Sequence, residues 1–287
     1  MLENQLLVRL IPFVSILATM MVLETLLPRR KRTESRAKRT LNNLLLTVVN
    51  SFVIKVLPIL SAVAAGTFAS QRDWGILNQF SWPVWLEFGI VIVLMDMLIY
   101  WQHVASHHIP ALWHFHQVHH ADHDLDASSG LRFHPVEIGF SMGIKCIAVI
   151  LLGAPPESVV LFEIVLNGCA VFNHSNVKLP LWIDRILRLI LVTPDMHRVH
   201  HSVEIDETNS NYGFNIPWWD RMFGTYRAQP RGEHSDLKLG LPEYPDSNQT
   251  VPLFAMLRMP WKKESDTNCF QQEDGDARFE AADERAA

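Results

Sequence analysis

The fold is decided by residues 82–120, which read WPVWLEFGIVIVLMDMLIYWQHVASHHIPALWHFHQVHH. Up to Trp101 this stretch is apolar except for Glu87, Asp96 and a few neutral residues. A helix that crosses a bilayer needs about 20 apolar residues, so the run predicts a membrane span. Seven histidines follow the run directly. The stretch therefore predicts a span that leads into a histidine-rich segment at one face of the membrane.

The histidines of the whole chain are crowded into one region. Thirteen of the 14 lie between His103 and His201. Residues three and four apart share one face of a helix, so each cluster with that spacing is expected to direct its imidazoles to one place. Neutral imidazole is the commonest metal ligand in proteins. Three such clusters predict a polyhistidine metal site made of His103, His107, His116, His119, His120, His197, His200 and His201.

Eight imidazoles are more than one metal ion needs. Tetrahedral zinc sites take four protein ligands at most, so two metals that divide the eight as three and five, or as four and four, are expected. Imidazole suits zinc, copper, iron and nickel alike. The ligand type therefore does not name the metal.

Further apolar runs predict that the chain is embedded in a membrane. Residues 6–27 and 44–69 are each long enough to span, and residues 138–152 and 159–172 are separated by a Gly-Ala-Pro-Pro turn that predicts a hairpin. We therefore expect an all-α integral membrane protein with about four to five transmembrane or re-entrant helices. These helices are expected to carry a cytoplasmic helical cap with a histidine-rich dimetal site.

A basic segment at residues 29–39 sets the expected orientation. The positive-inside rule places this segment in the cytoplasm, and counting spans onward brings all three histidine clusters to the same side. The segment needs no role beyond this topology signal, although it could also dock an acidic electron carrier. We expect N-terminal helices in residues 1–89, a catalytic domain in 90–228, and a polar cap followed by a disordered tail in 229–287.

Several carboxylates lie near the clusters. An ionisable group within a span is expensive, so Asp96 and Glu163 are functional candidates. Asp96 lies two helical turns before His103, where it is expected either to accept a hydrogen bond from a ligand imidazole or to pair with a neighbouring span. Six further acidic residues flank the clusters, and most of them are expected to form a solvated rim: Asp122, Asp124, Asp126, Asp195, Glu204 and Asp206.

Seven motifs together resemble the sterol desaturase and fatty acid hydroxylase superfamily. They run from the third apolar run to Tyr226, and their histidine order and spacing are highly specific. They are HVASH (103–107), LWHFHQVHH (112–120), LRFHPVE (131–137), NHSNV (173–177), TPDMHRVHHS (193–202), NYGF (211–214) and WDRMFGTY (219–226).

The resemblance implies an integral membrane non-haem enzyme with two iron ions as cofactor and O2 as co-substrate. The family's eight ligand histidines fall on the eight named above. His174 matches a further histidine on the metal side and is expected to be a metal ligand or a hydrogen-bond donor to one, although the family's partner four residues earlier falls on Ala170, which cannot ligate. His134 is expected to orient the site. His108, His114 and His123 fall outside the pattern, and His234 is expected to be exposed.

The implied activity is oxygen insertion into a C–H bond of a lipid or sterol, and desaturation on the same site remains the alternative. A zinc-dependent membrane hydrolase is less favoured because no H-E-x-x-H motif occurs. A haem protein or a zinc transporter fits the clustering less well. Three scattered cysteines are too few for an iron–sulfur cluster, so a separate electron donor such as a ferredoxin, cytochrome b5 or reductase is expected. A net charge of -5 gives no indication of nucleic-acid binding.

Overall fold

The computed structural model describes residues 5–57, 59 and 61–262, and these residues form an all-helical protein. Two isolated bridges, Pro28 with Val177 and Ser202 with Leu239, add the β pairing found within those ranges. The helices are α1 Gln5–Leu26, α2 Arg36–Val56, α3 Ala62–Ser70, η3 Leu77–Gln79, α4 Val84–His108, α5 Pro110–His120, η4 Ser129–Leu131, α6 Pro135–Leu152, α7 Pro156–Asn173, α8 Leu181–Leu187, α9 Pro194–His200, α10 Ile205–Thr208, α11 Trp218–Met222, α12 Ser247–Thr250, α13 Leu253–Arg258 and η5 Met259–Trp261.

Four of these helices, α1, α4, α6 and α7, are long and apolar enough to cross a membrane. The predicted hairpin is confirmed as α6 and α7, each of 18 residues. Gly153 ends α6 with a left-handed φ of 74°, and Pro156 begins α7. Glycine adopts this conformation without a Cβ penalty, and proline suits the first position of a helix. The Gly-Ala-Pro-Pro sequence therefore makes the tight reversal that brings both helices back to the histidine end.

The second predicted span, residues 44–69, is wrong as a single helix. The structure divides it into α2, which ends at Val56, and α3, which begins at Ala62. The sequence places Pro58 between them, and proline lacks the N–H that a continuous helix requires. Neither α2 nor α3 is among the helices long and apolar enough to span alone. The apolar composition of the run concealed the break.

Helix α2 turns its polar face inward and its apolar face outward. Arg39 and Asn43 are buried at 1% and 0% exposure, whereas Val48 and Phe52 are 64% and 66% exposed. The buried side chains bond to the histidine end of the molecule: Asn43 Nδ2 donates to Ser128 Oγ at 3.0 Å and Asn50 Nδ2 donates to the Phe133 carbonyl at 2.9 Å. Such an inverted pattern fits a helix whose outer face contacts lipid, because outward apolar side chains are favoured only in apolar surroundings.

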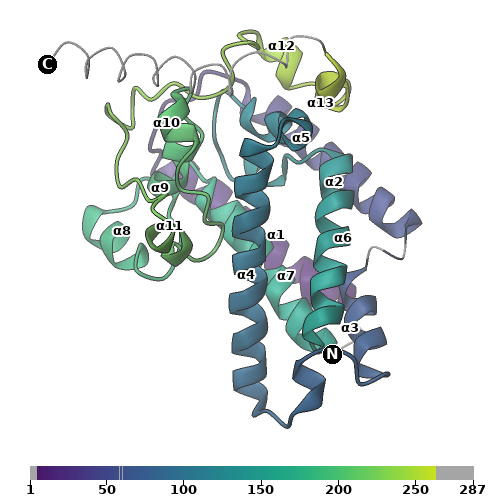
Figure 1. Ribbon diagram of the computed structural model, residues 1–287. Coiled ribbons are helices and arrows are strands. Elements are labelled where there is room, and N and C mark those ends of the chain that lie inside the picture. The colour runs from purple at the N-terminus through teal and green to yellow at the C-terminus, as the bar shows by residue number, and fades with distance from the viewer. Residues whose placement is uncertain (1–4, 58, 60, 263–287) are drawn as a thin grey trace, which may run out of the picture.

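The histidine site lies at one end of the long helices. In Figure 1, α4 and α6 run side by side and lead upward to α5, with α12 and α13 above it. The C-terminal segment covers α5 and α2 through a cluster of Leu46, Val118, Ala121, Tyr244, Met256 and Met259. The expected disordered tail falls mostly on residues 263–287, outside the described residues.

Candidate metal centre

Nine buried histidines form two adjoining groups. One group contains His103, His107, His116, His120 and His200, and the other contains His119, His174, His197 and His201. Within each group the candidate ligand nitrogens lie within 4.8 Å of one another. The eight histidines expected from the sequence are all included, and His174 joins them from the residue that follows α7. The division is therefore five and four, not three and five or four and four among eight.

Each H-x-x-H-H motif contributes to both groups, contrary to the expectation that one cluster faces one place. His116 and His120 belong to the first group, whereas His119 between them belongs to the second. In the third cluster the pair four apart, His197 with His201, belongs to the second group and His200 to the first. A helix turns about 100° per residue, so residues four apart nearly align while adjacent residues diverge. The motif thus supplies two neighbouring groups from one helical turn.

In the second group the Nε2 atoms converge on a common point. His174 Nε2 lies 3.0 Å from His119 Nε2 and 3.0 Å from His197 Nε2, and His197 Nε2 lies 3.2 Å from His201 Nε2. Metal–nitrogen bonds of about 2.0–2.1 Å at tetrahedral or octahedral angles place neighbouring nitrogens roughly 2.9–3.4 Å apart. The four imidazoles therefore have the spacing that one bound metal ion requires.

In the first group the ring nitrogens that face the group have no hydrogen-bond partner among the described residues. They include the Nε2 atoms of His103, His107, His116, His120 and His200. A buried polar atom without a partner costs free energy, and a clustered set of such atoms requires an explanation. A metal ion would accept all of these lone pairs. The donor set therefore fits a second metal beside the first.

Burial keeps the imidazoles outside the membrane helices neutral. Burial, reinforced by neighbouring imidazoles, lowers the pKa of His119, His120, His197 and His201 well below the usual value. Burial lowers the pKa of His174 to about 4 and that of His200 to about 3. Neutral imidazole is the form that ligates metals. These histidines are thus available as ligands at physiological pH.

Acceptors on the far side of several rings fix their tautomers. Nδ1 of His116 lies 2.7 Å from Glu137 Oε1, and Nδ1 of His103 lies 2.8 Å from the Tyr212 carbonyl. His200 and His174 use the carbonyls of Ser210 and Ala170 in the same way, both at 2.7 Å. An Nδ1–H donated outward leaves the Nε2 lone pair directed at the metal. Ala170, which cannot ligate, thus contributes through its backbone.

Glu137 was not identified from the sequence. It lies in the first turn of α6, and the side chain of His134 accepts a hydrogen bond from Val136 N as the N-cap of that helix. His134 thus acts on the site indirectly, because it fixes the start of the helix that carries Glu137. The available signal was the acidic residue of the sequence His134-Pro135-Val136-Glu137, because a proline often begins a helix and an acidic residue suits its first turn.

The predicted acidic rim is wrong for four of its six members. Asp122, Asp124, Asp126 and Asp195 are buried, whereas Glu204 and Asp206 are exposed as expected. Arg39 donates to both carboxylate oxygens of Asp122 at 2.9 and 2.7 Å and also pairs with Asp126. Buried charges require such partners. The partners come from the basic segment, which sequence reasoning could not align with acids some 85 residues away.

The basic segment therefore does more than signal topology. Arg29 Nε bonds to Asp195 at 3.0 Å, and the backbone amides of Thr33 and Glu34 donate to Asp124 at 2.7 and 2.6 Å. Asp195 and Asp124 lie next to the third and second histidine clusters in sequence. These contacts hold the two clusters against the N-terminal part of the chain.

Three further sequence expectations have different outcomes. Among the described residues, no hydrogen bond joins Asp96 to an imidazole or to a neighbouring span. It accepts hydrogen bonds from Trp219 Nε1 at 2.8 Å and Ile216 N at 3.2 Å, which fixes the segment after the third cluster. His234 is buried at 4% exposure because residues 228–240 fold back over α9, and it bonds to Gln229. His108, His114 and His123 lie outside both groups, as expected.

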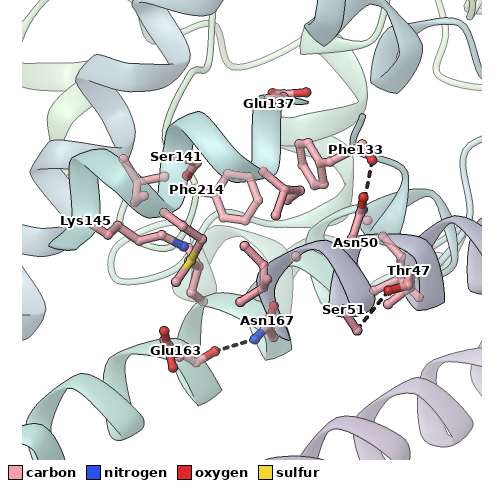
Figure 2. Close-up of a pocket in the computed structure, with 18 of the residues that line it drawn as sticks. Thr47, Asn50, Ser51, Phe133, Glu137, Ser141, Lys145, Glu163, Asn167 and Phe214 are labelled. Atoms are coloured by element: carbon pink, nitrogen blue, oxygen red, sulfur yellow. Dashed lines mark hydrogen bonds between the residues drawn. The ribbon is translucent and has the colours of Figure 1, made fainter. Parts of the chain in front are cut away.

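A cavity of about 450 Å³ adjoins the histidine groups. Gly130, Phe133 and Phe214 line its inner end, and Glu137, Ser141 and Lys145 follow along α6. Phe214 lies 6.4 Å from both His174 and His197, measured between ring centroids. Figure 2 shows these side chains around the hollow, with Glu163 on the opposite helix. Its volume is within the range of about 300–1,000 Å³ usual for small-molecule sites.

Four span-length apolar helices and two buried histidine groups define a class: helical proteins whose helices could cross a membrane and whose histidine groups could each hold a metal ion. Residues 88–225 match the model of the Fatty acid hydroxylase family. An ornithine lipid hydroxylase of Rhizobium tropici is 28% identical over 232 residues, covering 78% of this chain and 69% of that protein. An alkylglycerol monooxygenase of Danio rerio is 37% identical over 156 residues, covering 52% of this chain and 31% of that protein.

A protein of Arabidopsis thaliana named as a Delta(7)-sterol-C5(6)-desaturase is 28% identical over 188 residues, covering 61% of this chain and 62% of its own. No solved structure matches the chain. The family model, which covers a little under half of the chain, and these relatives confirm the resemblance to the sterol desaturase and fatty acid hydroxylase superfamily seen in the motifs. These relatives are oxidoreductases by name, and the chain spans about a third of the length of the monooxygenase.

Proposed function

We propose that this chain is a membrane-bound lipid hydroxylase that uses two iron ions and O2. The observation that carries the proposal is the pair of buried histidine groups, five and four, that adjoin each other at one end of the apolar helices. Hydroxylation is favoured over desaturation because the matched family model and a relative that matches 78% of this chain are both named as hydroxylases. Desaturation on the same histidines is the second candidate.

When bound, two irons would supply the chemistry that activates O2, with two electrons delivered by the donor, and that attacks an unactivated C–H bond. The protein's own part is to hold and orient the ligands and to exclude water. Glu137 and the carbonyls of Tyr212, Ser210 and Ala170 orient the rings of four histidines. The buried Arg39–Asp122–Asp126 network fixes the loop after α5 without adding an exposed charge.

The cavity beside the centre provides the substrate position. Apolar side chains such as Ile99, Leu131 and Met142 line much of it, and it lies among α1, α2, α4, α6 and α7. A substrate from the bilayer would enter sideways and place a C–H bond beside Phe214 and the histidines. A lipid or sterol is therefore the proposed substrate.

We infer orientation and reductant from the sequence. The positive-inside rule assigns the basic segment at residues 29–39 to the cytoplasm, and the hydrogen bonds of this segment to Asp124 and Asp195 support a centre on the same side. A separate ferredoxin, cytochrome b5 or reductase supplies the electrons from that side. Purified protein that completes turnover with NAD(P)H alone would contradict a separate donor.

The test is isotope incorporation in membranes that contain the donor. Membranes with the full chain are incubated under 18O2, and their lipids are compared with those of membranes carrying His197→Ala, which leaves three imidazoles in the four-histidine group. A lipid alcohol with one 18O atom, absent from the His197→Ala sample, is the expected result. His108→Ala is the matched control because His108 is exposed and lies outside both groups. A new double bond without 18O would establish the desaturase, and unchanged lipids would contradict both.

A further inference from the structure

The cavity holds a buried lysine that the chemistry at the histidines does not use. Lys145 lies in α6, one of the four span-length helices, and is 8% exposed. A charged residue at the centre of a transmembrane helix costs about 2.5–3.5 kcal/mol on insertion scales. Such a residue is tolerated where it lines a cavity or serves a function. Lys145 lines the cavity beside the histidine groups.

The lysine ammonium has no direct partner in the part of the chain that the structure describes. Glu163 on α7 is the carboxylate that acts on it through space, and Glu163 forms an ion pair with Arg9. Two cations therefore share one anion at this end of the cavity. Figure 2 shows Lys145 extending from α6 toward the middle of the hollow, not toward Glu163 below it. One positive charge is left for a ligand.

The position of Lys145 relative to the histidines is set by one helix. Glu137, Ser141 and Lys145 are spaced by four residues and all three line the cavity, so they form a polar stripe on one face of α6. Glu137 at the start of the stripe bonds to His116. Eight residues of helix rise about 12 Å, more than two turns. A length of mostly apolar cavity thus separates the charge of Lys145 from the histidines.

We propose that Lys145 binds the carboxylate of a single-chain lipid and thereby selects the substrate. The carboxylate fits because its single negative charge neutralises the uncompensated cation, and a charged hydrogen bond to a lysine is strong where water is scarce. The chain of the lipid then extends along α6, so the oxidised C–H bond lies several bonds away from the carboxylate. This inference rests on the proposed function for the oxidation, but the binding step does not depend on it.

The test measures binding without turnover. The full chain as purified in detergent is kept without O2, and binding of radiolabelled oleate and oleyl alcohol is measured separately by scintillation proximity. These lipids share a chain and differ in the charged group. The unmodified protein is expected to bind oleate about 10- to 100-fold more tightly than oleyl alcohol, the range expected for a hydrogen bond to a charged group. Lys145→Met is expected to reduce that ratio to about one and to leave oleyl alcohol binding unchanged.

Two variants separate recognition from structural support. Lys145→Arg keeps the charge and is expected to keep most of the preference for oleate. Lys55→Met is the matched control because Lys55 is exposed on α2 and lies outside the cavity. Oleyl phosphate distinguishes the source of the anion: equal or tighter binding than oleate would replace the carboxylate with a phosphate headgroup and overturn the assignment.

Other results would also overturn the proposal. If Lys145→Met weakens both lipids equally and lowers the melting temperature, and adding Glu163→Gln restores both, Lys145 only neutralises Glu163. Absence of any preference for oleate, or of binding by either lipid, would also contradict the proposal. Because binding is measured without O2, failure of the iron-dependent oxidation would leave these results intact, so the two proposals can fail separately.

Discussion

The two histidine groups differ in whether they hold more imidazoles than one tetrahedral metal site needs. The first has five imidazoles and the second has four, although both draw on the same two H-x-x-H-H motifs. Four ligands complete a tetrahedral site, so the first group can lose one imidazole and the second cannot. Adjacent residues such as His119 and His120 therefore differ in importance for a reason that their positions in sequence do not reveal.

The largest expected effect comes from His119→Ala compared with His120→Ala. His119→Ala leaves three ligands in the four-histidine group, so we expect loss of one metal and a fall in activity of more than about 100-fold, beyond the usual cost of an outer contact. His120→Ala leaves four imidazoles in its group and is expected to retain two metals per chain. Metal analysis of the purified variants checks both. Equal metal loss from the two variants would contradict the difference between the groups.

Arg39→Met is expected to have the next largest effect, and to affect both groups together. Arg39 is 1% exposed, and its loss removes the ion pairs to Asp122 and Asp126, so that Arg132 at 3.9 Å is the cation that stays near Asp122. Breaking a buried pair destabilises by about 3–5 kcal/mol. Thermal unfolding in detergent measures this loss of stability. The control is Arg231→Met, because Arg231 is 65% exposed and its partner Asp206 is 42% exposed, so the loss of this pair is expected to cost less than about 1 kcal/mol. Equal melting temperatures for the two variants would refute a structural role for the network.

Glu137→Leu is expected to weaken only the five-histidine group. It removes the acceptor for His116 Nδ1. Loss of such an outer contact typically lowers metal affinity about 10- to 100-fold. Chelator titration is expected to show one metal that is removed more easily and one that is unchanged. Glu137→Gln retains an oxygen acceptor and is expected to lie between Glu137→Leu and the parent. Equal weakening of both metals would show that Glu137 supports the whole fold.

The smallest expected effect concerns pH and the support of α9. Burial lowers the pKa of His234 to about 4, below the ordinary value near 6.5. The folded state disfavours the proton, so stability is fully present above about pH 6.5 and is lost as pH falls toward 4. Between pH 7 and 4.5 the melting temperature of His234→Gln is expected to fall less than that of the parent. The difference is about 2–4 °C for each kcal/mol of stability that the parent loses through His234. Parallel pH profiles for parent and variant would contradict this.

The sequence predicts the helical class, the hairpin and the histidines that converge, because local periodicity and apolar length control these features. It does not predict how the histidines divide, since that depends on the 100° rotation between His119 and His120 and on His174 arriving from another helix. The burial of Asp122 was not predictable for a related reason. Its partner Arg39 is 83 residues away, and pairing at that separation is set by tertiary packing. Composition also concealed the division of residues 44–69 into α2 and α3.

We propose that two metal ions bind in two separate histidine groups. The most direct measurement is metal content by elemental analysis with Mössbauer spectroscopy, on protein purified in mild detergent from iron-supplemented cells. We expect about two coupled irons per chain in the parent and about one iron in His119→Ala. A single metal per parent chain, or zinc alone that persists after anaerobic reconstitution with iron, would contradict it.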